Sequence, residues 1–365
     1  MRTAVLAAVE FFRTMRAVMP RAAGILLLVL APTALRAQVG SIQEFPNAYG
    51  KPQGIVAGPD GNLWVAEADR SRIAQVSPAG ILLQEIDLPD GSSPLAITVG
   101  PDGNLWFTEA GSFKIGKLSP LGTLIGEYSL GGAPESIAAG PDGSLWFTEP
   151  AANKIGKMDT SGSLLGEFPV RTAGSKPRGI TAGPCGDNHL YFTEQIGRIG
   201  RIDLSGSVTE LANTGLASNL GGITRGPAGD CNLYVVDRGQ DCVVRMAMNG
   251  QFIVMFLAVG SNPVGIVSGP DGNLWFTETG LNRIGHMSPS SDLPFASAVP
   301  SPSTSPEGIA VGPDGNIWFT ESVGNRVGRV LTGVSLPPTP TPTPPPGVTV
   351  LPRHATPAPR PFRTP

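Results

Sequence analysis

Residues 306–321 read Pro-Glu-Gly-Ile-Ala-Val-Gly-Pro-Asp-Gly-Asn-Ile-Trp-Phe-Thr-Glu, and residues 325–329 read Asn-Arg-Val-Gly-Arg. The same phrase recurs along the chain, and each copy starts from an anchor residue: Pro52, Pro94, Pro134, Pro177, Leu220, Pro263 and Pro306. Successive anchors are 42, 40, 43, 43, 43 and 43 residues apart. Seven copies at this period indicate a repeat architecture.

Each copy reads as a series of short strands separated by turns. Residues 308–312 form a small-residue strand, and the Pro-Asp-Gly-Asn segment at 313–316 has turn chemistry. Residues 317–321 are rich in aromatic and β-branched types, 326–330 form a third strand, and complete copies add a fourth, as at 164–170. Four strands per repeat predict an all-β, seven-bladed β-propeller. Helical repeats would need apolar residues at a spacing of ~3.6 and would not tolerate frequent Gly and Pro.

The tryptophans support this prediction. All five, Trp64, Trp106, Trp146, Trp275 and Trp318, occupy one position of the repeat, and Tyr191 and Tyr234 hold it in the other two copies. A ring at every repeat favours packing between blades. A stacking platform for sugars or bases is the alternative.

The first segment of the repeat region is expected to close the ring. Residues 40–46 resemble the fourth strands at 162–169 and 122–128, whereas the seventh repeat lacks such an ending. We therefore predict that the N-terminal strand completes the last blade. Such closure hides strand edges that would otherwise template aggregation.

The two ends of the chain differ from the repeats. Residues 1–37 combine arginines with an apolar run and end in Ala-Leu-Arg-Ala, which predicts a secretory signal peptide. An uncleaved anchor is the alternative, although the run is shorter than the ~20 residues that span a bilayer. The propeller is expected over 38–334. The Pro/Thr-rich segment at 335–365 predicts a disordered tail, which is either a glycosylated or wall-spanning spacer or an inert extension.

The charge balance excludes one class of partner. The chain carries 26 Lys and Arg against 29 Asp and Glu, and loss of residues 1–37, with five Arg and one Glu, changes the formal net charge from −3 to −7. An acidic domain without a basic face repels phosphate, so we exclude nucleic acid. The mature protein has no segment apolar enough to cross a membrane. We expect it to be secreted, periplasmic or associated with the cell envelope.

The chain has three cysteines. Cys185 and Cys231 fall in corresponding turns of neighbouring repeats, so we predict that they form a disulfide in an oxidising compartment. Cys242 is expected to be buried rather than reactive. The spacing of the three does not suggest a metal site.

The second strands all end in an acidic residue: Glu67, Glu109, Glu149, Glu194, Asp237, Glu278 and Glu321. This regularity favours a scaffold role, in which each carboxylate caps backbone donors or pairs with a nearby Lys or Arg. A cation site that uses Glu278 and Glu321 is the alternative.

The residue directly after each anchor varies instead: Gln53, Leu95, Glu135, Arg178, Gly221, Val264 and Glu307. On a propeller these positions open on the same face as the second-strand ends, here called the top face. Variation on a constant scaffold is where ligand specificity is expected. We therefore predict that Gln53, Glu135, Arg178 and Val264 contact substrate. Glu135 and Arg178 alternatively pair with one another.

The repeated Gly-Pro-Asp-Gly-Asn-Leu-Trp-Phe-Thr-Glu, followed by Asn-Lys/Arg-Ile-Gly-Lys/Arg, resembles the virginiamycin B lyase (streptogramin lyase) family over residues 40–330. The resemblance implies a seven-bladed propeller. It also implies an enzyme that linearises a cyclic depsipeptide antibiotic by Mg²⁺-assisted elimination, with one histidine as base and another in contact with substrate.

The family's histidines directly follow the last two anchors, where this chain has Val264 and Glu307. The metal-binding glutamate before the last anchor is Ser305 here, and only Glu321 keeps the type of the second metal-binding carboxylate. None of the three histidines of the chain is expected to take these places: His189, His286 and His354.

Two functions from different classes follow. The first is a monomeric, non-catalytic binding module whose top face takes a small molecule, a glycan or a protein. The alternative is a divergent metal-dependent enzyme, either a virginiamycin B lyase-type carbon–oxygen lyase or a lactonase-like hydrolase. In that case Glu307 acts as catalytic base, and Glu321 and Glu135 lie beside a divalent cation such as Mg²⁺.

Overall fold

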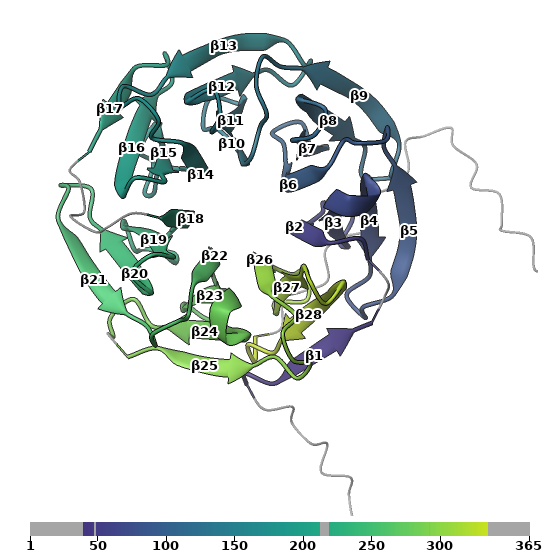
Figure 1. Ribbon diagram of the computed structural model, residues 1–365, viewed down its shortest axis with the longest axis vertical. Coiled ribbons are helices and arrows are strands. Elements are labelled where there is room, and N and C mark those ends of the chain that lie inside the picture. The colour runs from purple at the N-terminus through teal and green to yellow at the C-terminus, as the bar shows by residue number, and fades with distance from the viewer. Residues whose placement is uncertain (1–38, 47–48, 212–218, 292, 335–365) are drawn as a thin grey trace, which may run out of the picture. The chain divides into compact units, whose positions relative to one another are not determined.

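The computed structural model describes residues 39–46, 49–211, 219–291 and 293–334, so the predicted signal peptide and tail lie outside the described residues. The described residues form seven four-stranded antiparallel sheets around a common centre (Figure 1). The seven-bladed propeller predicted from the repeats is confirmed. Among the described residues, no helix has the length and apolarity needed to cross a membrane.

The strands occupy four positions in each blade, and the blades are counted from the one that begins with β2. The innermost strands are β2 (Pro52–Ala57), β6 (Pro94–Val99), β10 (Ile137–Ala139), β14 (Pro177–Ala182), β18 (Leu220–Arg225), β22 (Pro263–Ser268) and β26 (Pro306–Val311). The second strands are β3 (Leu63–Glu67), β7 (Leu105–Glu109), β11 (Leu145–Glu149), β15 (His189–Glu194), β19 (Leu233–Asp237), β23 (Leu274–Glu278) and β27 (Ile317–Glu321).

The third strands are β4 (Arg72–Val76), β8 (Lys114–Leu118), β12 (Lys154–Met158), β16 (Arg198–Asp203), β20 (Cys242–Met246), β24 (Arg283–Met287) and β28 (Arg326–Val330). The outer strands are β5 (Leu82–Asp87), β9 (Leu124–Ser129), β13 (Leu164–Pro169), β17 (Val208–Glu210), β21 (Phe252–Phe256), β25 (Phe295–Ala298) and β1 (Ile42–Phe45). The short 3-10 helices Ala68–Arg70 and Thr279–Leu281 follow β3 and β23.

A large ring on each second strand holds neighbouring blades together. The five tryptophans, Tyr191 and Tyr234 are buried, and each belongs to an apolar cluster that includes residues of the next blade. Trp64 packs with Ile97 and Phe107 of the second blade, for example. The rings therefore pack between blades and do not form an exposed stacking platform.

The turn aspartates fix these rings. Asp60 accepts a hydrogen bond from Trp64 Nε1 at 3.0 Å, and Asp230 accepts one from the Tyr234 hydroxyl at 2.6 Å. A buried polar hydrogen without a partner would cost ~1–3 kcal/mol. The Pro-Asp-Gly-Asn turn thus does more than reverse the chain, because its carboxylate allows an indole to be fully buried.

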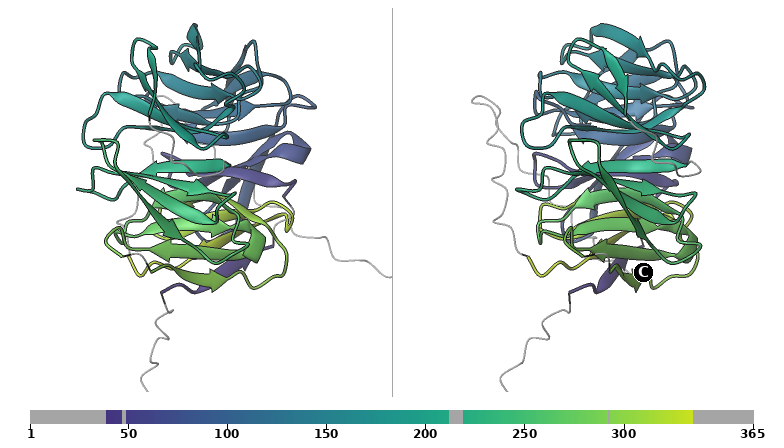
Figure 2. Two further views of the ribbon diagram at one scale, coloured as in Figure 1. Left: turned by 60° about the vertical axis from the view of Figure 1, so that its left-hand side comes forward. Right: turned by 90° about the vertical axis from the view of Figure 1, so that its left-hand side faces the viewer.

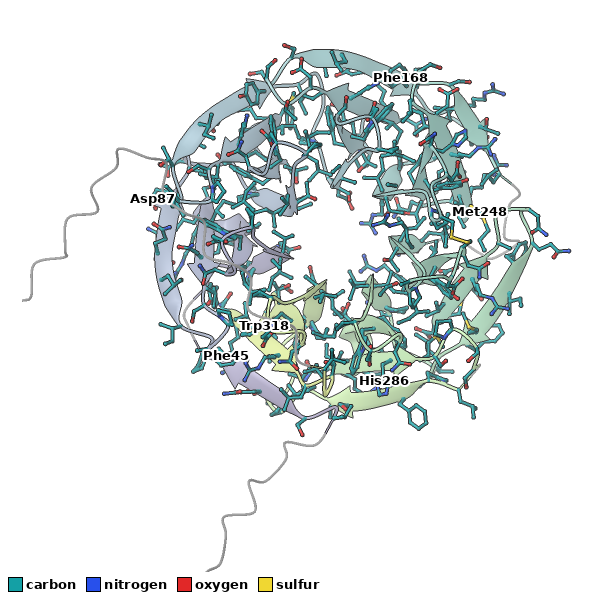
Figure 3. All side chains as sticks on the ribbon, turned by 180° about the vertical axis from the view of Figure 1, so that it is seen from behind. Phe45, Asp87, Phe168, Met248, His286 and Trp318 are labelled. Atoms are coloured by element: carbon teal, nitrogen blue, oxygen red, sulfur yellow. A yellow bond between two sulfur atoms is a disulfide. The ribbon has the colours of Figure 1, made fainter. Side chains whose placement is uncertain are left out.

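Strand β1 forms the outer strand of the seventh blade. It pairs antiparallel with β28 over four residue pairs, beside strands from the other end of the sequence (Figures 1 and 2). Phe45 of β1 stacks on Trp318 with ring centroids 5.1 Å apart, at the junction marked in Figure 3. Phe168 and Trp146 stack in the same way in the third blade, at 5.9 Å.

We expect Phe45→Ala to destabilise the whole propeller, because Phe45 is only 8% exposed and packs between the seventh and first blades. Truncation of a buried phenylalanine costs about 3–5 kcal/mol. Phe256→Ala is the matched control, since that ring is 65% exposed on an outer strand. Urea unfolding of both variants measures the difference, and equal midpoints would contradict a closing role for β1.

Candidate functional site

A cavity of about 510 Å³ lies at the centre of the ring, where the inner strands begin. The residues that directly follow the anchors all line it: Gln53, Leu95, Glu135, Arg178, Gly221, Val264 and Glu307. The structure thus brings the predicted substrate-contacting residues and the predicted base together in one place.

The inner strands are irregular where they line this cavity. The pairing of β2 with β3 shifts register between Pro52 and Ile55, and five other inner strands shift at the same place. A β-bulge of this kind re-aims side chains, so the residue after the anchor leaves the ladder and reaches the centre. The next residue in the sequence is glycine, Gly54. A Cβ at this position would lie only 2.5 Å from the Leu95 carbonyl oxygen, so a larger residue would clash.

Threonine hydroxyls fix the backbone of the cavity residues. The threonine of the Trp-Phe-Thr-Glu segment accepts a hydrogen bond from its own inner strand and donates one to the inner strand of the next blade. Thr277 Oγ1, for example, accepts from Gly265 N at 2.9 Å and donates to the Glu307 carbonyl at 3.0 Å. The site is therefore built on strands that are held to one another at their cavity-lining ends.

Glu135 and Arg178 form an ion pair in the cavity, with Arg178 Nε 3.1 Å from Glu135 Oε1. Arg178 Nη1 also donates to Asn219 Oδ1 at 3.4 Å. Burial raises the pKa of Glu135, and the positive charges of Arg178 and Arg238 oppose that rise. The charge of Arg178 is thus balanced inside the protein.

Arg238 is a cavity residue that the sequence reasoning missed. It follows Asp237 at the end of β19, where the other repeats carry Ala68, Ala110, Pro150, Gln195, Thr279 and Ser322. Burial and the nearby charge of Arg178 lower the pKa of Arg238, while Glu307 and Glu135 act in the opposite direction. The sequence does carry a signal for Arg238: the residue directly after the acidic end of each second strand varies among the repeats, as the residue after each anchor does.

Glu307 lies on the seventh blade with its carboxylate held in place. Ser322 Oγ donates a hydrogen bond to Glu307 Oε1 at 2.8 Å, and Ser322 occupies the same repeat position as Arg238. A side chain from the loop after the second strand therefore fixes the residue that stands at the predicted base position.

The acidic residues that end the second strands do not line the cavity. Glu278 accepts hydrogen bonds from Ser261 Oγ at 3.0 Å and from Arg283. Glu321 is fully buried, and burial together with the neighbouring Glu44 raises its pKa to about 7, with Arg326 opposing. Glu278 is therefore held by partners within its own blade, whereas neither carboxylate oxygen of Glu321 has a hydrogen-bond partner among the described residues.

Comparison with known proteins identifies the family of this chain. The model of the virginiamycin B lyase family matches residues 34–231 and 214–355. The chain belongs to this family. A virginiamycin B lyase from Staphylococcus aureus is 32% identical with a TM-score of 0.73, and the match covers 80% of this chain and 99% of that one.

Two further solved structures agree with this membership. A streptogramin B lyase is 29% identical with a TM-score of 0.73, covering 79% of this chain and 96% of that chain. A catalytically inactive histidine-to-alanine variant of the Staphylococcus aureus lyase, solved with quinupristin, is also 32% identical. No protein in the curated set matches the sequence.

The residues present do not fit the Mg²⁺ site that the family resemblance implies. Ser305 stands where the resemblance places one carboxylate ligand, and Glu321 lies beside Glu44 and Arg326 rather than in the cavity. Within the part of the chain that the structure describes, no three His, Cys, Asp or Glu side chains come together as a metal site.

Neither described histidine lines the cavity. His189 begins β15 and pairs with Asp187, and His286 stacks between Trp275 and Phe295 in the sixth blade. His354 lies outside the described residues.

Cys185 and Cys231 form a disulfide bond, the pairing favoured from the sequence, with Cα atoms 5.4 Å apart. The bond joins the turns that precede β15 and β19, so it links the fourth and fifth blades. Cys242 is buried, and burial raises the pKa of its thiol to about 12.

The buried acids make stability depend on pH. Burial and the neighbouring Glu167 raise the pKa of Glu149 from 4.5 to about 7. The folded state therefore binds this proton more tightly than the unfolded state, so the contribution is favourable below about pH 4.5 and is lost as pH rises to about 7.

We expect Glu149→Gln to be more stable than the wild type at pH 8, by about 1–3 kcal/mol, and nearly equal to it at pH 5. Thermal melting across this pH range measures the effect. Asp90→Asn, at an exposed position, is the control. A wild-type protein whose melting temperature rises between pH 5 and pH 8, with no change in the variant, would show that Glu149 is ionised in the fold.

Proposed function

We propose that this member of the virginiamycin B lyase family is a secreted, monomeric binding protein that holds a small ligand in its central cavity and does not perform elimination. The ligand is a small molecule, a glycan or a short segment of a protein. The retained propeller, the cavity and the varied side chains around it support this function.

The observation that carries the proposal is the identity of two cavity residues. Val264 offers no proton donor or acceptor, and Glu307 stands where the resemblance places the base. A general base contributes ~10²–10⁴-fold to a rate and has to lie within hydrogen-bond reach of the proton that it removes. Ser322 Oγ donates a hydrogen bond to one oxygen of the Glu307 carboxylate, Oε1.

Secretion is supported by two features of the chain. The N-terminal 37 residues have the composition of a signal peptide. The Cys185–Cys231 disulfide suits an oxidising compartment, because such bonds are rare in proteins of the cytosol.

We expect the purified protein to leave quinupristin intact in the presence of Mg²⁺. Mass spectrometry distinguishes the cyclic from the linear antibiotic, and the Staphylococcus aureus virginiamycin B lyase serves as the positive control. Linear product at a rate within ~10²-fold of that lyase would overturn the proposal, since loss of the base alone accounts for at least this factor.

A divergent metal-dependent enzyme is the second candidate, and one observation favours it: Glu135 and Glu307 line the same cavity. A cation that binds there would stabilise the fold by ~2.7 kcal/mol when its free concentration is a hundred times its Kd. We expect no such stabilisation with Mg²⁺, Mn²⁺ or Ca²⁺ in thermal melting. A saturable rise in melting temperature that Glu135→Gln abolishes would favour the enzyme instead.

A further inference from the structure

Arg238 presents a free guanidinium fork to the central cavity. Its Nε donates to Asn262 Oδ1 at 3.2 Å, and its terminal nitrogens have no hydrogen bond or ion pair with the described residues. A guanidinium presents paired N–H donors in a planar fork that matches a carboxylate or a phosphate. The cavity wall therefore contains an anion-binding group that the protein itself leaves open.

No neighbouring carboxylate forms an ion pair with this group. Glu135 is paired with Arg178 at 3.1 Å, and no carboxylate among the described residues lies within ion-pair distance of Arg238. Arg178 adds a second positive charge nearby, as its effect in lowering the pKa of Arg238 indicates. An added anion would give Arg238 the charged partner that Glu135 already gives Arg178.

Gln53, which lines the same cavity, supplies a second donor without a partner among the described residues. Its Nε2 is buried and has no hydrogen-bond partner among the described residues. Gln53 lies on β2, and β2 lies across the ring from β18 of the blade that carries Arg238 (Figure 1). Because the two donors lie on opposite sides of the ring, a ligand that used both would extend across the cavity.

We propose that the cavity binds a small organic carboxylate, with its carboxylate group on the Arg238 fork and a hydrogen-bond acceptor at the Gln53 amide. Hydroxyl or amino groups of the ligand then face Glu307 and Glu135. The inference rests on the proposed binding function and names its ligand class. A carboxylate is favoured over a phosphate because Glu135 and Glu307 would repel a dianion.

Two kinds of ligand share this chemistry, sugar acids and amino acids. Isothermal titration of the full protein with D-glucuronate and with L-glutamine, whose side-chain amide supplies a second acceptor, separates them. The counterparts that lack the carboxylate, the methyl ester of D-glucuronate and L-glutaminamide, test the need for this group, and inorganic phosphate tests selectivity. We expect at least one of the two carboxylates to bind and its counterpart without the carboxylate to bind at least roughly tenfold more weakly.

Arg238→Gln is expected to weaken carboxylate binding at least roughly tenfold, and Arg238→Lys, which keeps the charge but not the fork, to lie between it and the wild type. Arg225→Gln makes the same change at an exposed residue outside the central cavity and should bind like the wild type. Thermal melting establishes that each variant is folded.

Three results would overturn the inference: no binding of either carboxylate, binding of phosphate as tight as that of the carboxylate, or equal affinity in folded Arg238→Gln. These results differ from failure of the proposed function. Linearisation of quinupristin would remove the non-catalytic assignment even if Arg238 bound a carboxylate. An inert protein that bound no carboxylate would remove only the ligand class.

Discussion

The indole or phenol of each second strand is buried against the next sheet while its polar hydrogen stays bonded to an aspartate of its own turn. This contact sets the spacing between blades, because the same ring repeats in every copy. The threonine two residues later adds a hydrogen bond between neighbouring inner strands in five of the seven copies. Since blade spacing is fixed by residues outside the cavity, the cavity residues can change without disturbing the ring.

The repeat period and the turn chemistry were enough to predict the blades and their number, because both are local features that recur seven times. The cavity positions were also predictable, since Glu135, Arg178 and Glu307 stand directly after anchors and vary among constant neighbours. Arg238 and Ser322 were not predicted. Their side chains come from the loop after the second strand, and whether a side chain there reaches the cavity depends on its length and on its neighbours in space.

The acidic residues that end the second strands could be assigned no role from the sequence. Glu278 and Glu321 close the same strands as their counterparts, and the sequence leaves open whether such acids hold a cation or support the blade. The neighbours that the structure shows, Glu44 for Glu321 and Ser261 for Glu278, are distant in sequence or lie in irregular segments. Membership of the virginiamycin B lyase family therefore conveys the propeller, whereas the side chains around the centre, such as Val264 and Glu307, belong to this chain.

The pairing of β1 with β28 also has a consequence for biosynthesis. Residues near position 42 find their partners near position 330, so almost the entire domain must leave the ribosome before the last sheet can be completed. Contacts between such remote segments form slowly, because a long loop has to close first. Until then the nascent chain exposes an unpaired edge and the apolar face of Phe45, which makes newly made molecules candidates for chaperone capture.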